Sequence, residues 1–331
     1  MLSRRQENVK NFVLLCILVD TLLGLDKTCC FNFEEPDENS PPETDSSSED
    51  GIPSPSHIIG GTKAGKHEFP YIVSVRLKIN PKLPFGMGSI VTKPGSISED
   101  SRWIITAGHI PGEIRNPSTN PKIITRKLVV FPKYDSNWRK LAKHRYYTVK
   151  NAYCHPWPKS EPFPVDDIAL LELDSKIPLN KPNQNFKSIQ IADKNFDVTA
   201  NKRVTVAGWG LNQTKPPMIY DYLLKSDITI HSTSDCKKYY HNFVEIKWFC
   251  AGLHKNRKTK TICDGDSGAP GVSKTSGGDQ ILSGVVTGSN TLCTKPTTFM
   301  NVSHYRDWIE EVITTRPKKM LCKNLLKNRP A

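Results

Sequence analysis

The chain has 331 residues, enough for one large or two small domains with a sizeable core. Its formal net charge is +13, yet the residues before Ile58 hold 4 Lys or Arg and 11 Asp or Glu, leaving 42 and 22 from Ile58 onward, a net of +20. Charge alone permits nucleic-acid binding, but no recognition motif supports it, and no cysteines stand at metal-ligand spacing. We therefore expect no nucleic-acid partner, no metal and no cofactor.

Residues 1–25 have the pattern of a secretory signal peptide, with a basic start followed by an apolar run that ends at Leu25. Asp20 interrupts the run, which is too short for a comfortable membrane span of about 20 residues. We expect cleavage near Gly24, export from the cell and no stable membrane anchor. The alternative is a signal anchor that stays uncleaved.

Residues 26–57 have the composition of an acidic pro-segment. Between Thr28 and Thr62 there are eight acidic residues and no Lys or Arg, and the stretch is also rich in Ser and Pro. Such a segment cannot bury enough apolar surface to order itself. We expect it to be disordered in front of a basic domain.

Residues 71–303 alternate between short apolar strands and turns rich in Pro, Gly and Asn. Strands are expected at 71–79, 89–92, 122–131, 168–173, 204–208, 223–230 and 281–287. This spacing is typical of an all-β sandwich or barrel.

One helix is expected after the strands. Ser303 can cap its start, and Pro317 should stop it. Apolar side chains recur at helical spacing between them, and we expect this stripe to pack against the core. The stripe consists of Tyr305, Trp308, Ile309, Val312 and Ile313.

Ser267 lies in the run Cys263-Asp264-Gly265-Asp266-Ser267-Gly268-Ala269-Pro270. Glycine lets the backbone bend sharply and lets a substrate approach closely. The amide N–H groups of Gly265 and Ser267 could then point together at a developing oxyanion. Alone, the run could be an ordinary glycine turn, so the interpretation depends on other motifs.

Two other segments supply partners for a nucleophilic serine. Residues 102–109 read as a β-branched strand that ends in His109, and residues 165–173 place Asp167 just before an apolar strand. A serine is a weak nucleophile until a neighbouring base takes its proton, and the base needs a third group to fix its tautomer. His109, Asp167 and Ser267 fit these three roles.

These motifs resemble those of the trypsin/chymotrypsin-like serine proteases. The resemblance runs from residue 58 to about residue 313, and it includes Gly208-Trp209-Gly210, residues 248–252 and the closing residues 304–309. It implies a protease domain over 58–314, built as two packed six-stranded antiparallel β-barrels with a C-terminal helix and the active site between the barrels. A basic tail over 315–331 would follow.

The resemblance also implies the role of each site residue. His109 would be the general base, Asp167 its orienter and Ser267 the nucleophile. Gly265 and Ser267 would supply the oxyanion amides.

The run Ile58-Ile59-Gly60-Gly61 resembles the new N-terminus that zymogens of this family expose on cleavage. The freed ammonium of Ile58 would form a buried ion pair with Asp266. Removing one partner of such a pair costs about 3–5 kcal/mol, so the pair would switch the oxyanion hole between disordered and formed. Because His57 precedes the cut, we expect that trypsin does not activate this protein; the sequence does not identify the activating protease.

The resemblance also places the specificity pocket at Thr261, Ser289 and Thr297. Thr261 stands at the pocket floor, where it offers no charge to pair a buried Arg or Lys. Thr297 and Ser289 replace wall glycines, which favours small or medium uncharged side chains. Gly288 stands where the family usually has tryptophan, and this loss should weaken ordinary peptide binding.

Nine cysteines support secretion. The resemblance implies the pairs Cys236–Cys250 and Cys263–Cys293. Two other family disulfides are absent, since Gly86, Ile110, Val204 and Val272 occupy their positions. No family partner exists for Cys29, Cys30, Cys154 and Cys322. One possibility is that Cys29 or Cys30 tethers the pro-segment to the protease domain. The other is a bond between Cys154 and Cys322.

Taken together, the sequence predicts a secreted serine endopeptidase made as a zymogen, acting on protein or peptide substrates after small or uncharged residues. The rival is a protease-fold binding protein without useful activity.

Basic residues cluster at 122–150, 255–260 and 316–329, either as a solvated surface or as a docking surface for sulfated glycans or acidic proteins. Glycosylation sequons start at Asn212 and Asn301.

Overall fold

The computed structural model describes residues 61–78, 80–112, 128–132, 146–156, 165–182, 185–209, 222–253, 262, 265–288 and 295–322. The expected signal peptide and pro-segment lie outside these residues, as do most of the three basic clusters. Several single residues discussed above also lie outside them: Cys29, Cys30, Ile58, Asn212, Thr261, Cys263, Ser289 and Cys293.

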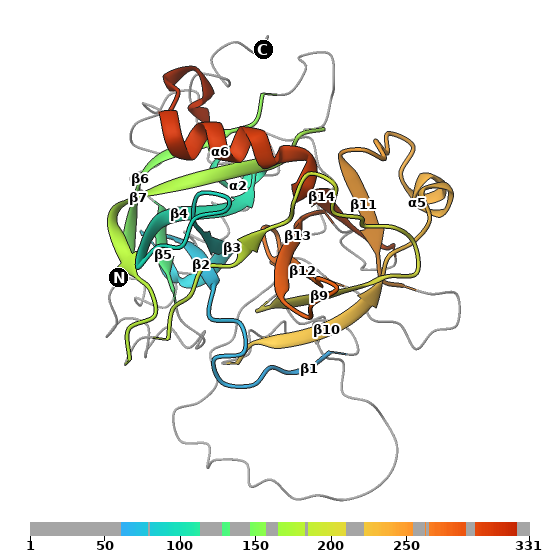
Figure 1. Cartoon of the computed structure of the whole chain (residues 1–331), viewed down its shortest axis with the longest axis horizontal. Helices are drawn as coiled ribbons and strands as arrows, with labels where there is room; N and C mark the ends of the chain where they lie inside the picture. The colour runs from blue at the N-terminus through green and yellow to red at the C-terminus, as the bar shows by residue number, and fades with distance from the viewer. Residues whose placement is uncertain are drawn as a thin grey trace, which may run out of the picture. The chain divides into compact units, whose positions relative to one another are not determined.

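Six antiparallel strands close into a barrel in the order β2-β3-β4-β7-β6-β5 (Figure 1). Their alternating apolar side chains fill the interior, where most are fully buried. The strands are β2 (Ile72–Leu77), β3 (Asn80–Val91), β4 (Asp100–Ala107), β5 (Leu128–Phe131), β6 (Tyr147–Cys154) and β7 (Ile168–Pro178).

The second sheet runs in the order β1-β10-β9-β12-β13-β14-β11, with β8 beside β13 in parallel. A bridge between Ile230 and Ala251 joins the segment after β10 to β11, so six antiparallel strands curl round on themselves. The strands are β1 (Thr62–Lys63), β8 (Gln190–Ile191), β9 (Arg203–Gly208), β10 (Leu224–Thr229), β11 (Trp248–Ala251), β12 (Pro270–Lys274), β13 (Gln280–Gly288) and β14 (Thr297–Asn301).

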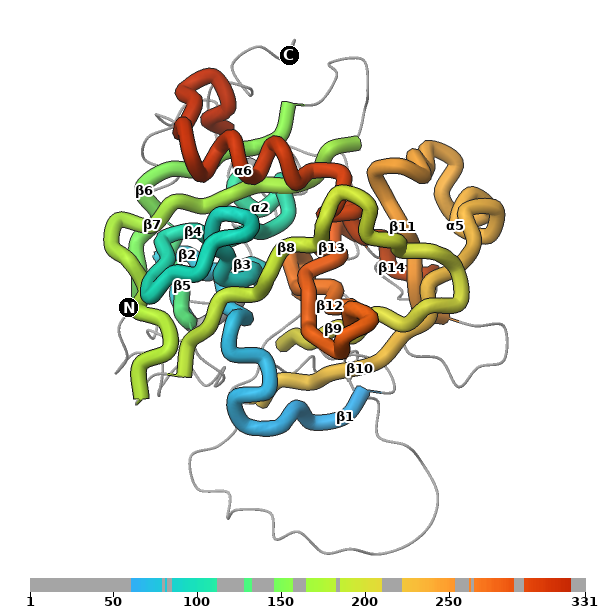
Figure 2. The backbone as a smooth tube through the Cα atoms, viewed as in Figure 1, coloured from blue at the N-terminus to red at the C-terminus, as the bar shows by residue number. Residues whose placement is uncertain are grey.

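The colours of Figure 2 separate the two sets of strands along the chain. Strands β2 to β7 form the first barrel, and all but one of the strands of the second sheet follow them in sequence. The expected all-β fold with two barrels and a C-terminal helix is confirmed.

The C-terminal helix differs from its prediction at the start. The apolar stripe is buried as expected, but Ser303 does not cap α6 (Arg306–Thr315). It lies inside a 3-10 turn, η1 (Val302–Tyr305), where its hydroxyl donates to the side chain of Asn301 at 2.8 Å. The helix ends one residue before Arg316, which adopts a left-handed conformation with φ 49° ahead of Pro317.

The other described helices are short: α2 (His109–Gly112), α5 (Thr233–Tyr239) and η2 (Lys318–Met320). Among the residues that the structure describes, no helix has the length and apolar character needed to cross a membrane.

Two disulfide bonds lie in the described part of the chain. One joins Cys236 in α5 to Cys250 in β11. The other joins Cys154 at the end of β6 to Cys322, where Leu321 also forms a β-bridge with Tyr153. The last described segment is therefore fixed onto the first barrel.

The Cys154–Cys322 bond closes a loop of 168 residues, so its removal releases much chain entropy in the unfolded state. The double variant Cys154→Ala/Cys322→Ala should lose about 2–5 kcal/mol of unfolding free energy, measured by urea denaturation. The Cys236–Cys250 bond spans only 14 residues, so Cys236→Ala/Cys250→Ala should lose less. Stability equal to the unaltered protein in the first variant would contradict this expectation.

Candidate active site

The pairing of β4 with β7 brings two candidate site residues together. Ala107 at the end of β4 lies opposite Ile168 at the start of β7. His109 follows Ala107 by two residues, and Asp167 immediately precedes Ile168. Antiparallel register therefore places the histidine and the carboxylate side by side at one end of the first barrel.

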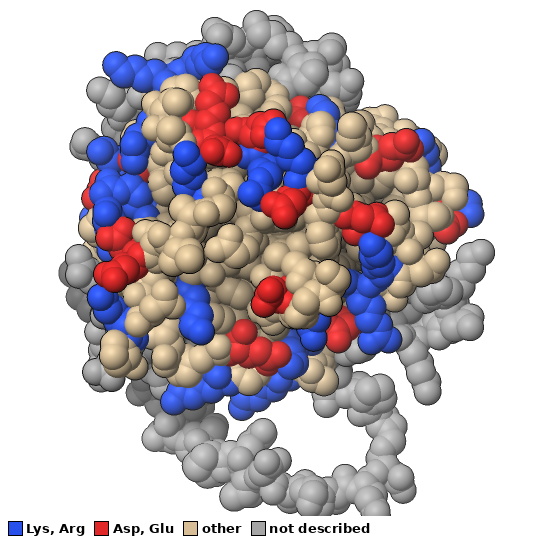
Figure 3. Space-filling view, viewed as in Figure 1, with Lys and Arg blue, Asp and Glu red and all other residues tan. Residues whose placement is uncertain are grey.

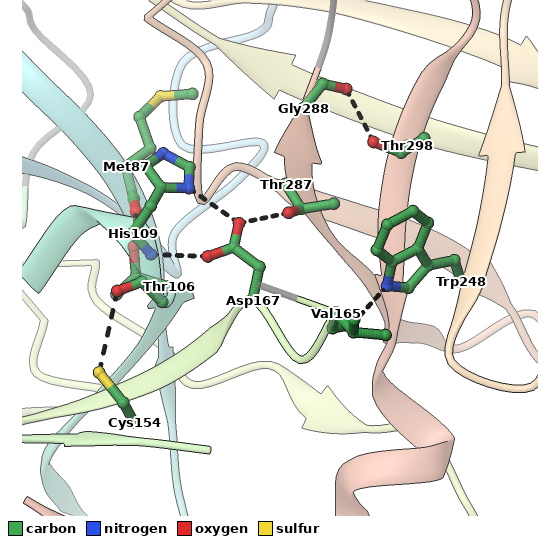
Figure 4. Close-up of polar contacts among 11 residues, drawn as sticks. Met87, Thr106, His109, Cys154, Val165, Asp167, Trp248, Thr287, Gly288 and Thr298 are labelled. Atoms are coloured by element: carbon green, nitrogen blue, oxygen red, sulfur yellow. Dashed lines mark hydrogen bonds and ion pairs between the residues drawn. The ribbon is translucent and has the colours of Figure 1, made fainter. Parts of the chain in front are cut away.

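The Asp167 carboxylate is 2% exposed and accepts hydrogen bonds on both oxygens (Figure 4). Its Oδ1 accepts from the backbone N–H of His109 at 2.6 Å. Its Oδ2 lies 2.8 Å from His109 Nδ1 and also accepts from the Thr287 hydroxyl. Thr287 belongs to β13, so the carboxylate joins the two sheets.

This geometry fixes the tautomer of His109. A carboxylate oxygen only accepts, so Nδ1 carries the proton that it donates to Asp167. The neutral ring then keeps a lone pair on Nε2. An imidazole held in this way can take a proton from a neighbouring hydroxyl.

The loop of Ser267 packs against the elements that carry the histidine. The Ser267 carbonyl accepts from the backbone N–H of Met87 in β3 at 2.8 Å. Gly268 has φ 82°, and a Cβ there would lie 2.1 Å from the Met87 carbonyl oxygen and 3.0 Å from Ile110 Cδ1. Ile110 follows His109, so the residues after the histidine and after the serine lie close together. Only glycine fits at position 268.

Gly265 also has a positive φ, of 92°. Asp266, between Gly265 and Ser267, is 1% exposed. Its carboxylate lies against β9, where a Cβ on Gly208 would approach Asp266 Oδ1 within 2.0 Å. The acid next to the serine is therefore turned into the second barrel.

The loop before β7 is held from the other side as well. Asp166 is 2% exposed; its Oδ1 accepts from the Tyr305 hydroxyl at 2.8 Å and lies 2.8 Å from Lys247 Nζ. Trp248 Nε1 donates to the carbonyl of Val165 at 2.7 Å. Residues 165–167 thus contact side chains from β11, from the segment before it and from η1.

Two titratable neighbours of Asp166 are shifted by burial. Burial raises the pKa of Tyr305 well above its usual range, with Asp166 acting in the same direction, so the hydroxyl stays protonated and donates. Burial lowers the pKa of His155, whose Nδ1 lies 3.7 Å from Asp166 Oδ1. The neutral ring is favoured, and Lys247 is then the cation that balances Asp166.

Of the pocket residues, Thr297 lies among the described ones. It is fully buried in β14, and its hydroxyl oxygen accepts from the backbone N–H of Ile262 at 3.4 Å. Gly288 ends β13, where its carbonyl accepts from the Thr298 hydroxyl at 3.1 Å. A side chain at Gly288 would begin 3.3 Å from that hydroxyl oxygen.

Sequence reasoning missed Thr287 and the partners of Asp166. A signal for Thr287 did exist, since it is a hydroxyl residue at the end of a strand expected at 281–287. Nothing in the sequence links Lys247 or Tyr305 to Asp166, because these contacts span 81 and 139 residues of chain.

One β-barrel carries a histidine and its carboxylate, and the other carries a glycine-flanked serine. This arrangement defines the class of two-barrel serine hydrolases. Residues 58–309 match the family described as Trypsin. The chain therefore belongs to the trypsin family of serine proteases.

Curated relatives include two proteins named Granzyme M. The one from Homo sapiens is 28% identical over 261 residues, covering 77% of this chain and 88% of the relative. The one from Rattus norvegicus is 28% identical over 262 residues, covering 77% and 89%.

Removal of the Thr287 hydroxyl should weaken the hold on Asp167. Hydrogen bonds to charged groups contribute about 1.5–3 kcal/mol, so Thr287→Val should lower kcat/KM on a peptide substrate about ten- to a hundredfold. Thr287→Ser should retain most of the activity. Thr205→Val is the matched control, since Thr205 donates to an exposed carboxylate, Asp227. Equal activity of the two valine variants would show that the contact is not needed.

Proposed function

We propose that this protein is a secreted serine endopeptidase, made as a zymogen, that hydrolyses peptide bonds through His109, Asp167 and Ser267. The observation that carries the proposal is the buried Asp167 carboxylate, which accepts from both the backbone and the ring of His109. Membership of the trypsin family supports the same assignment.

In the proposed mechanism, His109 Nε2 takes the proton of the Ser267 hydroxyl as the oxygen attacks the substrate carbonyl. The tetrahedral oxyanion accepts from the amides of Gly265 and Ser267. Collapse of this intermediate expels the amine, which receives its proton from His109, and leaves an acyl group on Ser267. Water then attacks the acyl group with His109 again as the base, and the Ser267 oxygen leaves with the proton returned by His109, which releases the carboxylic acid.

Asp166 and its partners support this mechanism indirectly. They hold the loop that carries Asp167 from the second sheet, so the carboxylate has little freedom to turn away from His109. A fixed histidine orientation reduces the reorganisation needed at the moment of proton transfer.

Activation is proposed to need cleavage between His57 and Ile58, after which the Ile58 ammonium pairs with Asp266. The buried position of Asp266 beside Ser267 supports this, because a charge that pairs with it there would lie close to the proposed oxyanion amides. An unidentified protease other than trypsin would make the cut, since His57 is not a trypsin site.

Substrate preference is proposed to be for small or uncharged residues before the cut bond, set by Thr261, Ser289 and Thr297. The buried position of Thr297, with its hydroxyl turned to Ile262, supports a short pocket. Secretion is supported by two disulfide bonds, which are typical of oxidising compartments.

A second function is a protease-fold protein that binds without cleaving. Gly288 favours it, because the aromatic wall that this position usually carries in the family is lost. The labelling experiment below separates the two functions.

The zymogen switch is tested with a secreted protein in which an engineered cleavage site replaces the residues before Ile58. After cutting, a fluorophosphonate probe should label Ser267 at least about a hundredfold faster than in the uncut protein, because the activating ion pair contributes about 3–5 kcal/mol. Ser267→Ala should not label. Trypsin added to the natural sequence should not yield a chain that begins at Ile58, as read by N-terminal sequencing.

Absence of labelling, with Ile58 confirmed as the N-terminus and the protein folded, would favour the binding function.

Substrate preference is tested with a peptide library on the cut protein. Cleavage after small or medium uncharged residues should exceed cleavage after Arg or Lys by about a hundredfold, because the pocket offers no charge to a buried cation. Thr297→Gly should shift the preference toward larger uncharged residues. A preference for Arg or Lys in the unaltered protein would refute the pocket assignment.

A further inference from the structure

A basic pocket lies on the first barrel, where the C-terminal segment returns to β6. Its volume is about 500 Å³. Strands β4, β6 and β7 provide five of its lining residues, and the segment after α6 provides three. They are Arg102, Lys150, Asn151, Tyr153, Glu172, Arg316, Lys318 and Leu321. The pocket thus brings together Lys150 from the first basic cluster of the sequence and Arg316 and Lys318 from the last.

The lining holds four cations and one acid, Glu172, a formal surplus of three positive charges. Glu172 is 2% exposed and forms ion pairs with two of the cations. Its Oε1 lies 3.0 Å from Arg316 Nε and 4.0 Å from an Arg102 nitrogen. Its Oε2 accepts from the side chains of Asn151 at 2.8 Å and Tyr153 at 3.3 Å. The carboxylate therefore orients the two guanidinium groups and leaves the remaining N–H donors for an anion.

Arg316 is positioned by more than its ion pair. Its guanidinium carbon lies 5.5 Å from the centre of the Trp103 ring, and its backbone N–H donates to Val312 at 3.0 Å. The pocket wall is fixed by the Cys154–Cys322 disulfide and the bridge between Tyr153 and Leu321. A preformed site loses less entropy on binding than a flexible patch.

Elsewhere in the described part of the chain, surface lysines commonly face an acid. Exposed ion pairs join Lys176 to Asp100, Lys194 to Asp307, Lys202 to Asp197, Lys237 to Glu245 and Lys238 to Asp235. Figure 3 shows basic and acidic side chains interspersed over the face that it draws. The lining of this pocket differs from these places, because its cations outnumber its acids by three.

We propose that this pocket binds the sulfate groups of a sulfated glycan. Guanidinium groups hold tetrahedral oxyanions through paired N–H donors, and ammonium groups add positive charge. The volume falls in the range of sites that hold small ligands, about 300–1,000 Å³, and therefore suits a saccharide unit with its sulfates.

Two observations favour a sulfated glycan over nucleic acid. The one aromatic residue in the lining, Tyr153, is buried, so the described pocket offers no platform on which a base could stack. The disulfide bonds favour an oxidising compartment, outside the cell, where sulfated glycans are abundant polyanions.

Burial raises the pKa of Tyr153 to about 12, so its hydroxyl keeps donating to Glu172 at neutral pH.

Binding is tested by calorimetry on the full chain carrying Ser267→Ala, so the result does not depend on protease activity. The probes are a size-defined heparin-derived oligosaccharide, its desulfated form, and single-stranded DNA of equal charge. The sulfated form should bind, and added salt should weaken its binding about tenfold from low to physiological ionic strength. The desulfated form and the DNA should bind at least about tenfold more weakly.

The variant Lys150→Glu/Lys318→Glu reverses two exposed pocket charges and should raise the Kd for the sulfated form about tenfold or more. The matched control is Lys66→Glu/Lys274→Glu, which changes net charge equally at exposed lysines outside the lining; its Kd should change less than about threefold. Thermal unfolding checks that both variants are folded.

Equal weakening in both variants would overturn the proposal, since binding would then follow net charge alone. Equal binding of the DNA or of the desulfated form would overturn it as well, as would no binding of the sulfated oligosaccharide.

Discussion

The buried carboxylate of Asp167 is the group on which the arrangement of the site depends. It accepts from the backbone and ring of His109, which the first barrel supplies, and from Thr287, which the second sheet supplies. An ionised carboxylate out of contact with water costs several kcal/mol unless such donors surround it. The same charge that orients the histidine therefore also holds β13 against the first barrel.

Asp166, one residue earlier, is also a buried carboxylate that donors from other elements hold. Asp166 lies in the turn that precedes β7, where the two successive acids reach different partners. Asp167 meets His109, whereas Asp166 meets Lys247 and Tyr305. The dipeptide is thus fixed from both sides, and each carboxylate limits the rotation that would release the other.

Local patterns were enough to predict most of the strands and the family. Short apolar runs between turns identified β2, β9, β10 and β13 within two residues at each end, and they identified β7 at its start but five residues short of its end. Strand β6 was missed because Lys150 and Asn151 interrupt its alternation at a bulge in its pairing with β7. The helix start was misplaced for a related reason: Ser303 has the chemistry of a cap, but a 3-10 turn comes first and takes its hydroxyl elsewhere.

The site residues also fall into two groups, those that a local motif identifies and those that depend on tertiary contacts. His109, Asp167 and Ser267 could be singled out because each lies in a local motif, and the register of β4 with β7 explains why the first two meet. The partners of Asp166, the Thr287 contact and the Cys154–Cys322 bond could not be derived, since they depend on tertiary approach across many residues. From the sequence, that disulfide was one of two alternatives, because cysteine spacing does not encode pairing.

The Cys154–Cys322 bond also determines what a cut within the chain would do. The bond encloses about half of the polypeptide, including the segments that carry Asp167 and Ser267. A single nick between residues 155 and 266 would separate His109 from Ser267 along the backbone, yet leave the two pieces covalently joined. A protein that cleaves its own loops could therefore persist as a two-chain molecule with both halves of its site still attached, for as long as its surroundings remain oxidising.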